Sequence, residues 1–175
     1  MRLWLSSFYL FCKDPEQQRK ARRAIDFERV LQYSQESLAA AQESGGDSFS
    51  EDQALMIGLM RWFKGDFFTW FRAKCQFCQS TSMRGNGQVP PSAEESSVGW
   101  ASRTELYECN DCKQITRFPR YNNPSQLLLS RTGRCGEFAN AFCLLCRSLA
   151  LDARYVLDFT DHVWVEVCLS VCPTR

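Results

Sequence analysis

The 175-residue chain predicts an α+β fold with one hydrophobic core and a small appendage. Three observations support this prediction. Apolar residues recur at three- and four-residue steps in the first half of the chain and again after Cys135, as they do in helices. Residues 153–159 and 162–167 alternate or run apolar, which is typical of strands. Between these parts lie two Cys-x-x-Cys pairs, which indicate a small metal-binding unit.

Composition excludes some classes of protein. Hydrophobic residues make up 45% of the chain and aromatic residues 13%, so wholesale disorder is excluded. The balance of 21 Lys and Arg against 20 Asp and Glu gives no reason to expect nucleic acid or an acidic membrane surface as a partner. The apolar run 3–11 resembles a weak signal-peptide core, but no small-x-small cleavage site follows before Lys13. The run is also too short to span a bilayer, so we expect no membrane span.

Residues 1–50 are predicted to form an N-terminal helical segment. Asp14 and Pro15 suit a helix start, with the acid as cap and the proline at the first helical position. One helix is expected to run from there to Ser44-Gly45-Gly46. Ser50 then opens a second, buried helix that continues through an aromatic-rich stretch to Phe71. An aromatic stripe at helical spacing is core far more often than a carbohydrate platform.

Four cysteines in two pairs predict a metal site: Cys75, Cys78, Cys109 and Cys112. Two intervening residues let both sulfurs of a pair reach one ion, and two pairs complete the tetrahedral four-sulfur shell that zinc prefers. Such a closed shell predicts one structural Zn²⁺ rather than a redox pair. The competing interpretation is a zinc ribbon that binds nucleic acid, which the charge balance disfavours.

The metal site lies in a predicted insertion, residues 75–112, within a core of residues 51–175. Its Gly-, Pro- and Ser-rich part, 83–99, is expected to be a flexible excursion. Two strands between Leu106 and Tyr121 are expected to flank the second cysteine pair. Ser125 is expected to cap a short turn that follows them. Pairing of the cysteines for a metal favours a reducing compartment.

Cys135 is the candidate nucleophile. Gly133 and Gly136 surround it, and a helix is predicted from Cys135 to about Leu149, which puts the thiol at a helix N-terminus. Unpaired N–H groups and the helix dipole favour a thiolate there, and Arg134 adds a positive charge. The alternative is a buried cysteine that packs like a small hydrophobic residue.

His162 is the only histidine, and it begins a predicted strand. A single histidine is usually just a packed or exposed side chain. A helix followed by two strands can, however, bring His162 close to Cys135. A cysteine nucleophile and a histidine base are the minimum set for acyl transfer.

These motifs together resemble the cytoplasmic peptide:N-glycanases of the transglutaminase-like superfamily. The resemblance covers about residues 27–167 and rests on both cysteine pairs, Thr116–Asn122, the Gly133–Glu137 turn and Asp161–Trp164. It implies a transglutaminase-like (papain-like) core and a structural zinc. The implied activity is hydrolysis of the bond between an asparagine side chain and the first N-acetylglucosamine of misfolded glycoproteins. The resemblance further implies cytoplasmic location, with ubiquitin-shuttle receptors and the proteasome pathway as partners.

In such an enzyme, Cys135 would attack the amide carbonyl and His162 would protonate the departing glycosylamine, before water hydrolyses the thioester. Backbone N–H groups near the helix start are the expected oxyanion donors. The chain departs from the family pattern at Phe138, where a tryptophan is usual. It also has no counterpart of the aspartate that orients the histidine, because neither Asp158 nor Asp161 occupies that position. Little or no activity is therefore expected of this chain.

Two other functions remain open. One is a non-catalytic module that retains contacts with glycoproteins or shuttle receptors, and the other is transglutamination with a lysine amine as acceptor. Rapid alkylation of Cys135 at neutral pH would favour an enzyme, whereas an inert thiol would favour the module. Incorporation of a labelled amine would indicate transglutamination.

Overall fold

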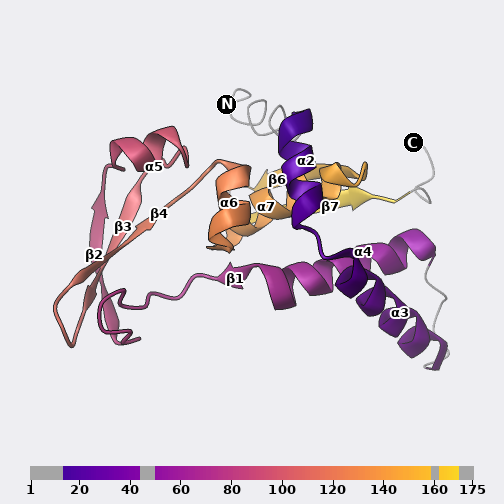
Figure 1. Cartoon of the computed structure of the whole chain (residues 1–175), viewed down its shortest axis with the longest axis horizontal. Coiled ribbons are helices and arrows are strands. Elements are labelled where there is room, and N and C mark those ends of the chain that lie inside the picture. Colours follow the sequence, from indigo (N-terminus) through magenta and orange to yellow (C-terminus); the bar gives the residue numbers. More distant parts are fainter. Residues whose placement is uncertain (1–13, 44–49, 159–161, 170–175) are drawn as a thin grey trace.

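The computed structural model describes residues 14–43, 50–158 and 162–169, and it shows an α+β fold (Figure 1). A central group of elements packs around the helix that begins with the candidate nucleophile. It consists of α2 (Pro15–Ala24), α6 (Pro124–Ser130), α7 (Cys135–Ser148), β6 (Asp152–Asp158) and β7 (His162–Cys168). On one side of this group lie α3 (Phe27–Glu43) and α4 (Glu51–Trp62), which pack against each other.

On the other side lies a lobe of three strands and one short helix, which we call the cysteine lobe (Figure 1). Its elements are β2 (Met83–Val89), α5 (Ala93–Ser97), β3 (Thr104–Cys109) and β4 (Ile115–Pro119). None of the helices in the described ranges combines the length and apolarity needed to cross a bilayer. The apolar run 3–11 and the predicted helix end at Gly45-Gly46 lie outside the described residues.

The prediction of a single helix after Asp14 was wrong, because α2 and α3 are separate helices. Asp14 does cap α2 as predicted, since its carboxylate accepts the N–H of Glu16 at 2.9 Å. Ile25 is extended, with φ −77° and ψ 125°. The carboxylate of Asp26 then accepts the N–H of Arg29 at 3.0 Å. An aspartate that bonds to nearby backbone in this way starts a new helix rather than continuing the old one.

The helix predicted from Ser50 to Phe71 is capped as expected but ends earlier. Ser50 and Gln53 form a capping box, in which each side chain accepts the backbone N–H of the other residue, at 3.2 and 2.8 Å. After α4, one wider π-helical turn, η1 (Phe63–Phe67), leads into the short strand β1 (Thr69–Trp70). The N–H of Thr69 donates to the carbonyl of Arg131 at 2.9 Å. A segment distant in the sequence thus supplies the acceptor that the preceding turn would supply in a continued helix.

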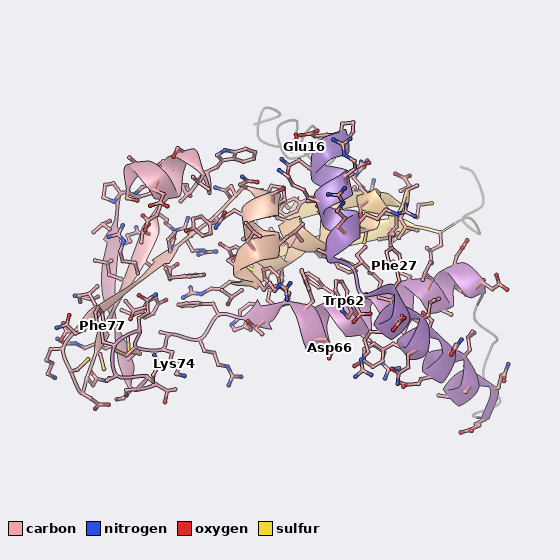
Figure 2. The ribbon with its side chains drawn as sticks, viewed as in Figure 1. Glu16, Phe27, Trp62, Asp66, Lys74 and Phe77 are labelled. Carbon is pink, nitrogen blue, oxygen red and sulfur yellow. The ribbon has the colours of Figure 1, made fainter. Side chains whose placement is uncertain are left out.

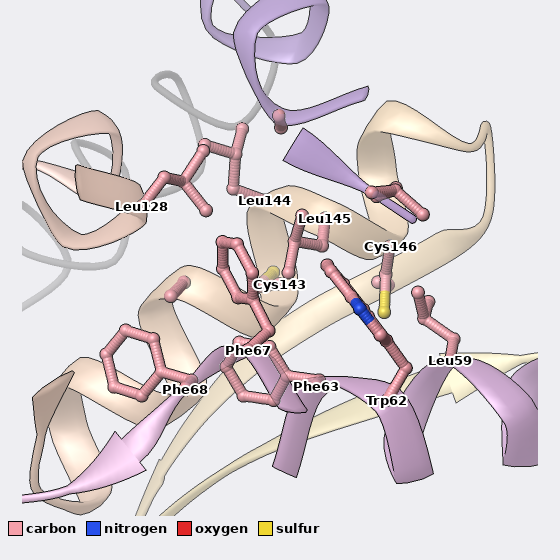
Figure 3. Packing of buried hydrophobic residues seen from close by; sticks show 14 of the residues in the cluster. Leu59, Trp62, Phe63, Phe67, Phe68, Leu128, Cys143, Leu144, Leu145 and Cys146 are labelled. Atoms are coloured by element: carbon pink, nitrogen blue, oxygen red, sulfur yellow. The ribbon is translucent and has the colours of Figure 1, made fainter. Parts of the chain in front are cut away.

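The aromatic stripe of α4 and η1 is core, as predicted. Trp62, Phe63, Phe67 and Phe68 are at most 5% exposed, and they face the leucines and cysteines of α7 (Figure 3). The rings of Phe63 and Phe68 stack with centroids 5.2 Å apart. This packing fixes the buried face of α7, and it extends to the first turn of the helix, where Phe138 contacts Phe63 and Phe68.

Residues 83–99 are ordered structure, so the prediction of a flexible excursion was wrong. Strand β2 pairs antiparallel with β3, and α5 follows with a capping box between Ser92 and Glu95. The register shifts between Gly85 and Gln88, and Gly87 has φ +78°. The side chains of β2 are largely exposed, so its order comes from backbone hydrogen bonds to β3, which composition does not reveal. The two strands predicted around the second cysteine pair are confirmed as β3 and β4.

The elements around Cys135 largely follow the prediction. Helix α6 begins at a different cap, since Asn123 rather than Ser125 accepts a backbone N–H, that of Ser125 at 3.0 Å. Helix α7 begins at Cys135, and β6 and β7 form an antiparallel hairpin packed against it. The two short strands β1 and β5 (Thr132–Gly133) pair in parallel directly before Cys135.

Candidate active site

Cys135 is the first residue of α7, and its side chain is exposed. Arg134, the preceding residue, is extended and forms the N-cap. Its backbone N–H donates to the carboxylate of Glu137 at 3.0 Å, and its carbonyl accepts the N–H of Phe138 at 2.8 Å. The thiol therefore stands in solvent at the end of a buried helix, in contrast to a cysteine that merely fills space in a core.

A pocket of about 590 Å³ opens beside this thiol. Its walls come from α4, η1, β1, α7 and β7, and most of the lining side chains are apolar. Trp70 and Trp164, which are 53% and 40% exposed, present large aromatic surfaces to it. Phe138 lines the same pocket and contacts Phe68 edge to face, with ring centroids 4.7 Å apart. A pocket of this size admits a small molecule or part of a larger substrate.

His162 is the first residue of β7 and is exposed. The next three residues, Val163 to Val165, line the same pocket as Cys135. In the hairpin, His162 is paired in register with Asp158. Side chains of such pairs start about 4.5–5.5 Å apart, so Asp158 is the described carboxylate set opposite the histidine. Asp161 lies outside the described residues.

Tyr155 is a residue near the thiol that the sequence analysis missed. A Cβ atom at Gly136 would lie 3.9 Å from the Tyr155 hydroxyl, which places that hydroxyl beside the first turn of α7. Burial, followed by the proximity of Cys135, raises the pKa of Tyr155 to about 12, so its hydroxyl is neutral at physiological pH. Nothing in the strand pattern distinguishes this tyrosine from an ordinary core residue.

The four cysteines of the lobe come together, with all four sulfurs within 4.8 Å of one another. The sulfurs of Cys75 and Cys112 are 3.4 Å apart, and those of Cys78 and Cys109 are 3.5 Å apart. Tetrahedral zinc with Zn–S bonds of about 2.3 Å would require sulfurs about 3.8 Å apart. The donor set and its spacing therefore fit a metal ion held by four thiolates.

Backbone N–H groups favour a thiolate at the first cysteine of each knuckle, whereas the neighbouring thiols and burial raise the pKa of Cys78 and Cys112. The N–H of Cys78 donates to the sulfur of Cys75 at 3.5 Å, and the backbone N–H groups of Cys78 and Phe77 hold the pKa of the Cys75 thiol at about 6. The backbone N–H groups of Cys112 and Asp111 lower the pKa of Cys109 in the same way. Figure 2 shows Phe77, of the first knuckle, in the cysteine lobe and far from Trp62 of the core. Such a metal would support the fold of the lobe.

The charge of Arg134 is balanced by an acid, which the sequence analysis did not anticipate. Its guanidinium donates to Glu105 at 2.8 Å and to the hydroxyl of Tyr107. Glu105 also pairs with Arg120 at 2.9 Å, and Arg120 pairs with Glu137 through two bonds of 2.6 and 3.0 Å. Desolvation opposes ionisation of Glu105, but the bonds from Tyr107 and Arg120 and the charge of Arg134 hold its pKa below the usual value.

The sequence model of the transglutaminase-like superfamily matches residues 69–172, which is more than half of the chain. The chain belongs to the transglutaminase-like superfamily. The matched span contains the cysteine lobe, the helix that begins at Cys135 and the β6–β7 hairpin. The superfamily assignment confirms the predicted fold class: a transglutaminase-like α+β core with a helical N-terminal part and a four-cysteine subdomain.

Within the superfamily, the chain is similar to relatives named peptide-N(4)-(N-acetyl-beta-glucosaminyl)asparagine amidase. It is 49% identical over 120 residues to that of Caenorhabditis elegans, 41% over 160 residues to that of Homo sapiens and 43% over 163 residues to that of Oryza sativa subsp. japonica. These matches cover 68%, 90% and 92% of this chain, but 20%, 24% and 35% of the relatives. The chain thus spans between a fifth and about a third of the length of these relatives.

Proposed function

We propose that this chain carries the site of a peptide:N-glycanase, an amidase that cleaves the bond between an asparagine side chain and the first N-acetylglucosamine. The observation that carries this proposal is the exposed thiol of Cys135 at a helix start, inside a pocket of about 590 Å³. The names of the similar relatives supply the substrate class. The exposed faces of Trp70 and Trp164 suit contact with the apolar face of a sugar ring.

The reaction would proceed through a thioester. The sulfur of Cys135 forms a bond to the side-chain amide carbon, while His162 protonates the nitrogen, so that the carbon–nitrogen bond breaks and the glycosylamine leaves. Water then attacks the thioester, and His162 accepts its proton. The thiol is regenerated, and aspartate remains in the peptide. Backbone N–H groups at the start of α7 are the proposed donors to the oxyanion.

The proposed metal is one structural Zn²⁺, held by Cys75, Cys78, Cys109 and Cys112. Its contribution when bound is to cross-link the two knuckles, because a four-thiolate shell has no open position for substrate or water. The proximity of the four sulfurs supports this assignment, together with the N–H groups that favour thiolates at Cys75 and Cys109.

The proposed setting is the cytoplasm, with misfolded N-glycoproteins as substrates and with ubiquitin-shuttle receptors and the proteasome pathway as partners. No disulfide joins the eight cysteines of the described residues, which is compatible with a reducing compartment. The partners follow from the resemblance to the glycanases alone.

Release of glycan from a denatured glycoprotein tests the proposal. The unmodified chain is compared with Cys135→Ala, and Cys168→Ser serves as matched control, because Cys168 is also an exposed thiol but lies at the opposite end of β7 from His162. Since no counterpart of the orienting aspartate is present, we expect slow release by the unmodified chain, loss of that release in Cys135→Ala and an unchanged rate in Cys168→Ser. Equal release by the unmodified chain and Cys135→Ala would contradict the nucleophile. Binding of a glycopeptide without any release would favour the non-catalytic module.

A further inference from the structure

Four charged residues form a closed ring between the cysteine lobe and the start of α7, with three links between side chains and one from a side chain to a backbone N–H. We call Glu105, Arg120, Arg134 and Glu137 the charge ring. Glu105 lies on β3 and Arg120 directly follows β4, so both belong to the lobe. Arg134 and Glu137 belong to the N-cap and first turn of α7. Acid and base alternate around the ring, so its formal charges cancel.

Each member of the charge ring contacts its two neighbours through charge-assisted hydrogen bonds. Glu105 joins the two arginines, with distances of 2.9 Å to Arg120 and 2.8 Å to Arg134. Two nitrogens of the Arg120 guanidinium donate to the carboxylate of Glu137. This carboxylate closes the ring by accepting a hydrogen bond from the backbone N–H of Arg134. The side chain of Glu137 is only 5% exposed and that of Arg120 15%. Such shielded, bidentate contacts hold geometry far better than exposed ion pairs do.

The ring acts on the residue immediately before the nucleophile. Glu137 holds the backbone of Arg134 and Glu105 holds its side chain. Neither the backbone nor the side chain of Arg134 can therefore rotate without breaking a hydrogen bond. Gly133 provides the space for this arrangement, because a Cβ atom there would lie 2.2 Å from Cβ of Glu137. The glycine therefore lets Glu137 fold back over the chain that leads into Cys135.

We propose that the charge ring is a positioning device for Cys135. It connects the start of α7 to the sheet of the cysteine lobe, and it keeps the sulfur and the free N–H groups of the first turn aligned toward the pocket. Its four members are positioning residues, since none of them lines the pocket that contains Cys135. The effect of the charge ring on catalysis rests on the proposed function, whereas its effect on the reactivity of the Cys135 thiol does not.

Alkylation of Cys135 measures this effect without any substrate. Arg120→Lys keeps the charge but loses the bidentate contact. Glu105→Gln removes the negative charge that both arginines share and replaces one of its two acceptor oxygens by a donor. The matched control is Arg117→Lys, because Arg117 makes an equally short bidentate pair with Glu95 (2.9 and 2.8 Å) in the same lobe but has no contact with the ring. The second-order rate of reaction with iodoacetamide at pH 7 is followed for the Cys135 peptide by mass spectrometry.

We expect both ring variants to react about tenfold more slowly at Cys135, because the thiolate loses aligned N–H groups, and the control to react at the wild-type rate. Rates are taken well below the melting temperature of each variant, so a change in stability alone cannot produce the difference. Unchanged rates in both ring variants, or equal slowing in the control, would overturn the proposal. If the ring variants slow alkylation while the unmodified chain neither binds a glycopeptide nor releases glycan, the charge ring stands and the proposed function fails.

Discussion

At the scale of single residues, His162 can be tested more sharply than most candidate bases, because it is the only imidazole in the chain. We expect His162→Gln to abolish the slow glycan release of this chain, since the variant keeps a hydrogen-bonding side chain but cannot carry the proton. A time course of glycan release under single-turnover conditions measures this loss.

The alkylation rate of Cys135 in the same variant shows whether the pocket survives. A rate within about threefold of wild type, together with lost release, would place the defect in proton transfer rather than in folding. Unchanged glycan release in His162→Gln would remove the histidine from the mechanism.

The sequence pointed to Cys135 and His162 because glycines flank the one and the other is unique. It did not point to Glu137, since a capping box is sought after serine or threonine, whereas here arginine occupies the cap. Glu105 and Arg120 could not be predicted for a different reason. Their partners are distant along the chain, and a charged residue in a sequence does not show which opposite charge it pairs with.

At the scale of elements, the crossing of α3 and α4 depends on Gly58. A Cβ atom at this position would lie 2.2 Å from Oγ of Ser34 and 2.4 Å from the carbonyl oxygen of Val30. Alanine favours helices by about 1 kcal/mol over glycine, but the backbone carbonyl can move only if the helices separate. We therefore expect Gly58→Ala to destabilise the protein by about 1–3 kcal/mol, measured by thermal unfolding.

Gly65→Ala is the matched control for that experiment, because no atom lies within 4 Å of the position that its Cβ would occupy. Its effect should stay within about 0.5 kcal/mol. A Gly58→Ala variant as stable as Gly65→Ala would show that the two helices do not cross as closely as described.

Local signals along the chain predicted elements well where a side chain caps or buries them. Asp14 and Ser50 cap helices as their types suggest, and the aromatic stripe before Trp70 is core. The break at Asp26 was missed because an aspartate in a charged stretch fits a helix surface equally well. Strand β2 was missed because its hydrogen bonds come from β3, which no local pattern encodes.

At the scale of the whole molecule, removal of the metal should affect both the cysteine lobe and the start of α7. We expect about one zinc ion per chain by elemental analysis and its loss on treatment with a strong chelator. Strands β2 to β4 should then lose protection from hydrogen exchange, because the knuckles at their ends are no longer cross-linked. The buried face of α7 should stay protected.

The same treatment should slow alkylation of Cys135, because the lobe then holds Glu105 and Arg120 of the charge ring less firmly. The decrease in rate should be about as large as the decrease in Arg120→Lys. Cys168→Ser, which leaves all four proposed ligands in place, is the control and should retain the metal. Full protection of the lobe after chelation would contradict a structural metal.

The parallel pairing of β1 with β5 has a consequence for engineering. Thr69 pairs with Thr132 and Trp70 with Gly133, so the segment that leads into the cysteine lobe is hydrogen-bonded to the segment that leads into Cys135. Between them the chain forms the lobe and then α6, whose Leu127 and Leu128 are buried in the core. A linker that replaces residues 72–120 would therefore remove the lobe but keep α6 and the pairing of β1 with β5, and the entropic cost of closing such a loop changes only slowly with its length. It would also leave Arg134 and Glu137 without their partners, which separates the folding of this core from the alignment of its nucleophile.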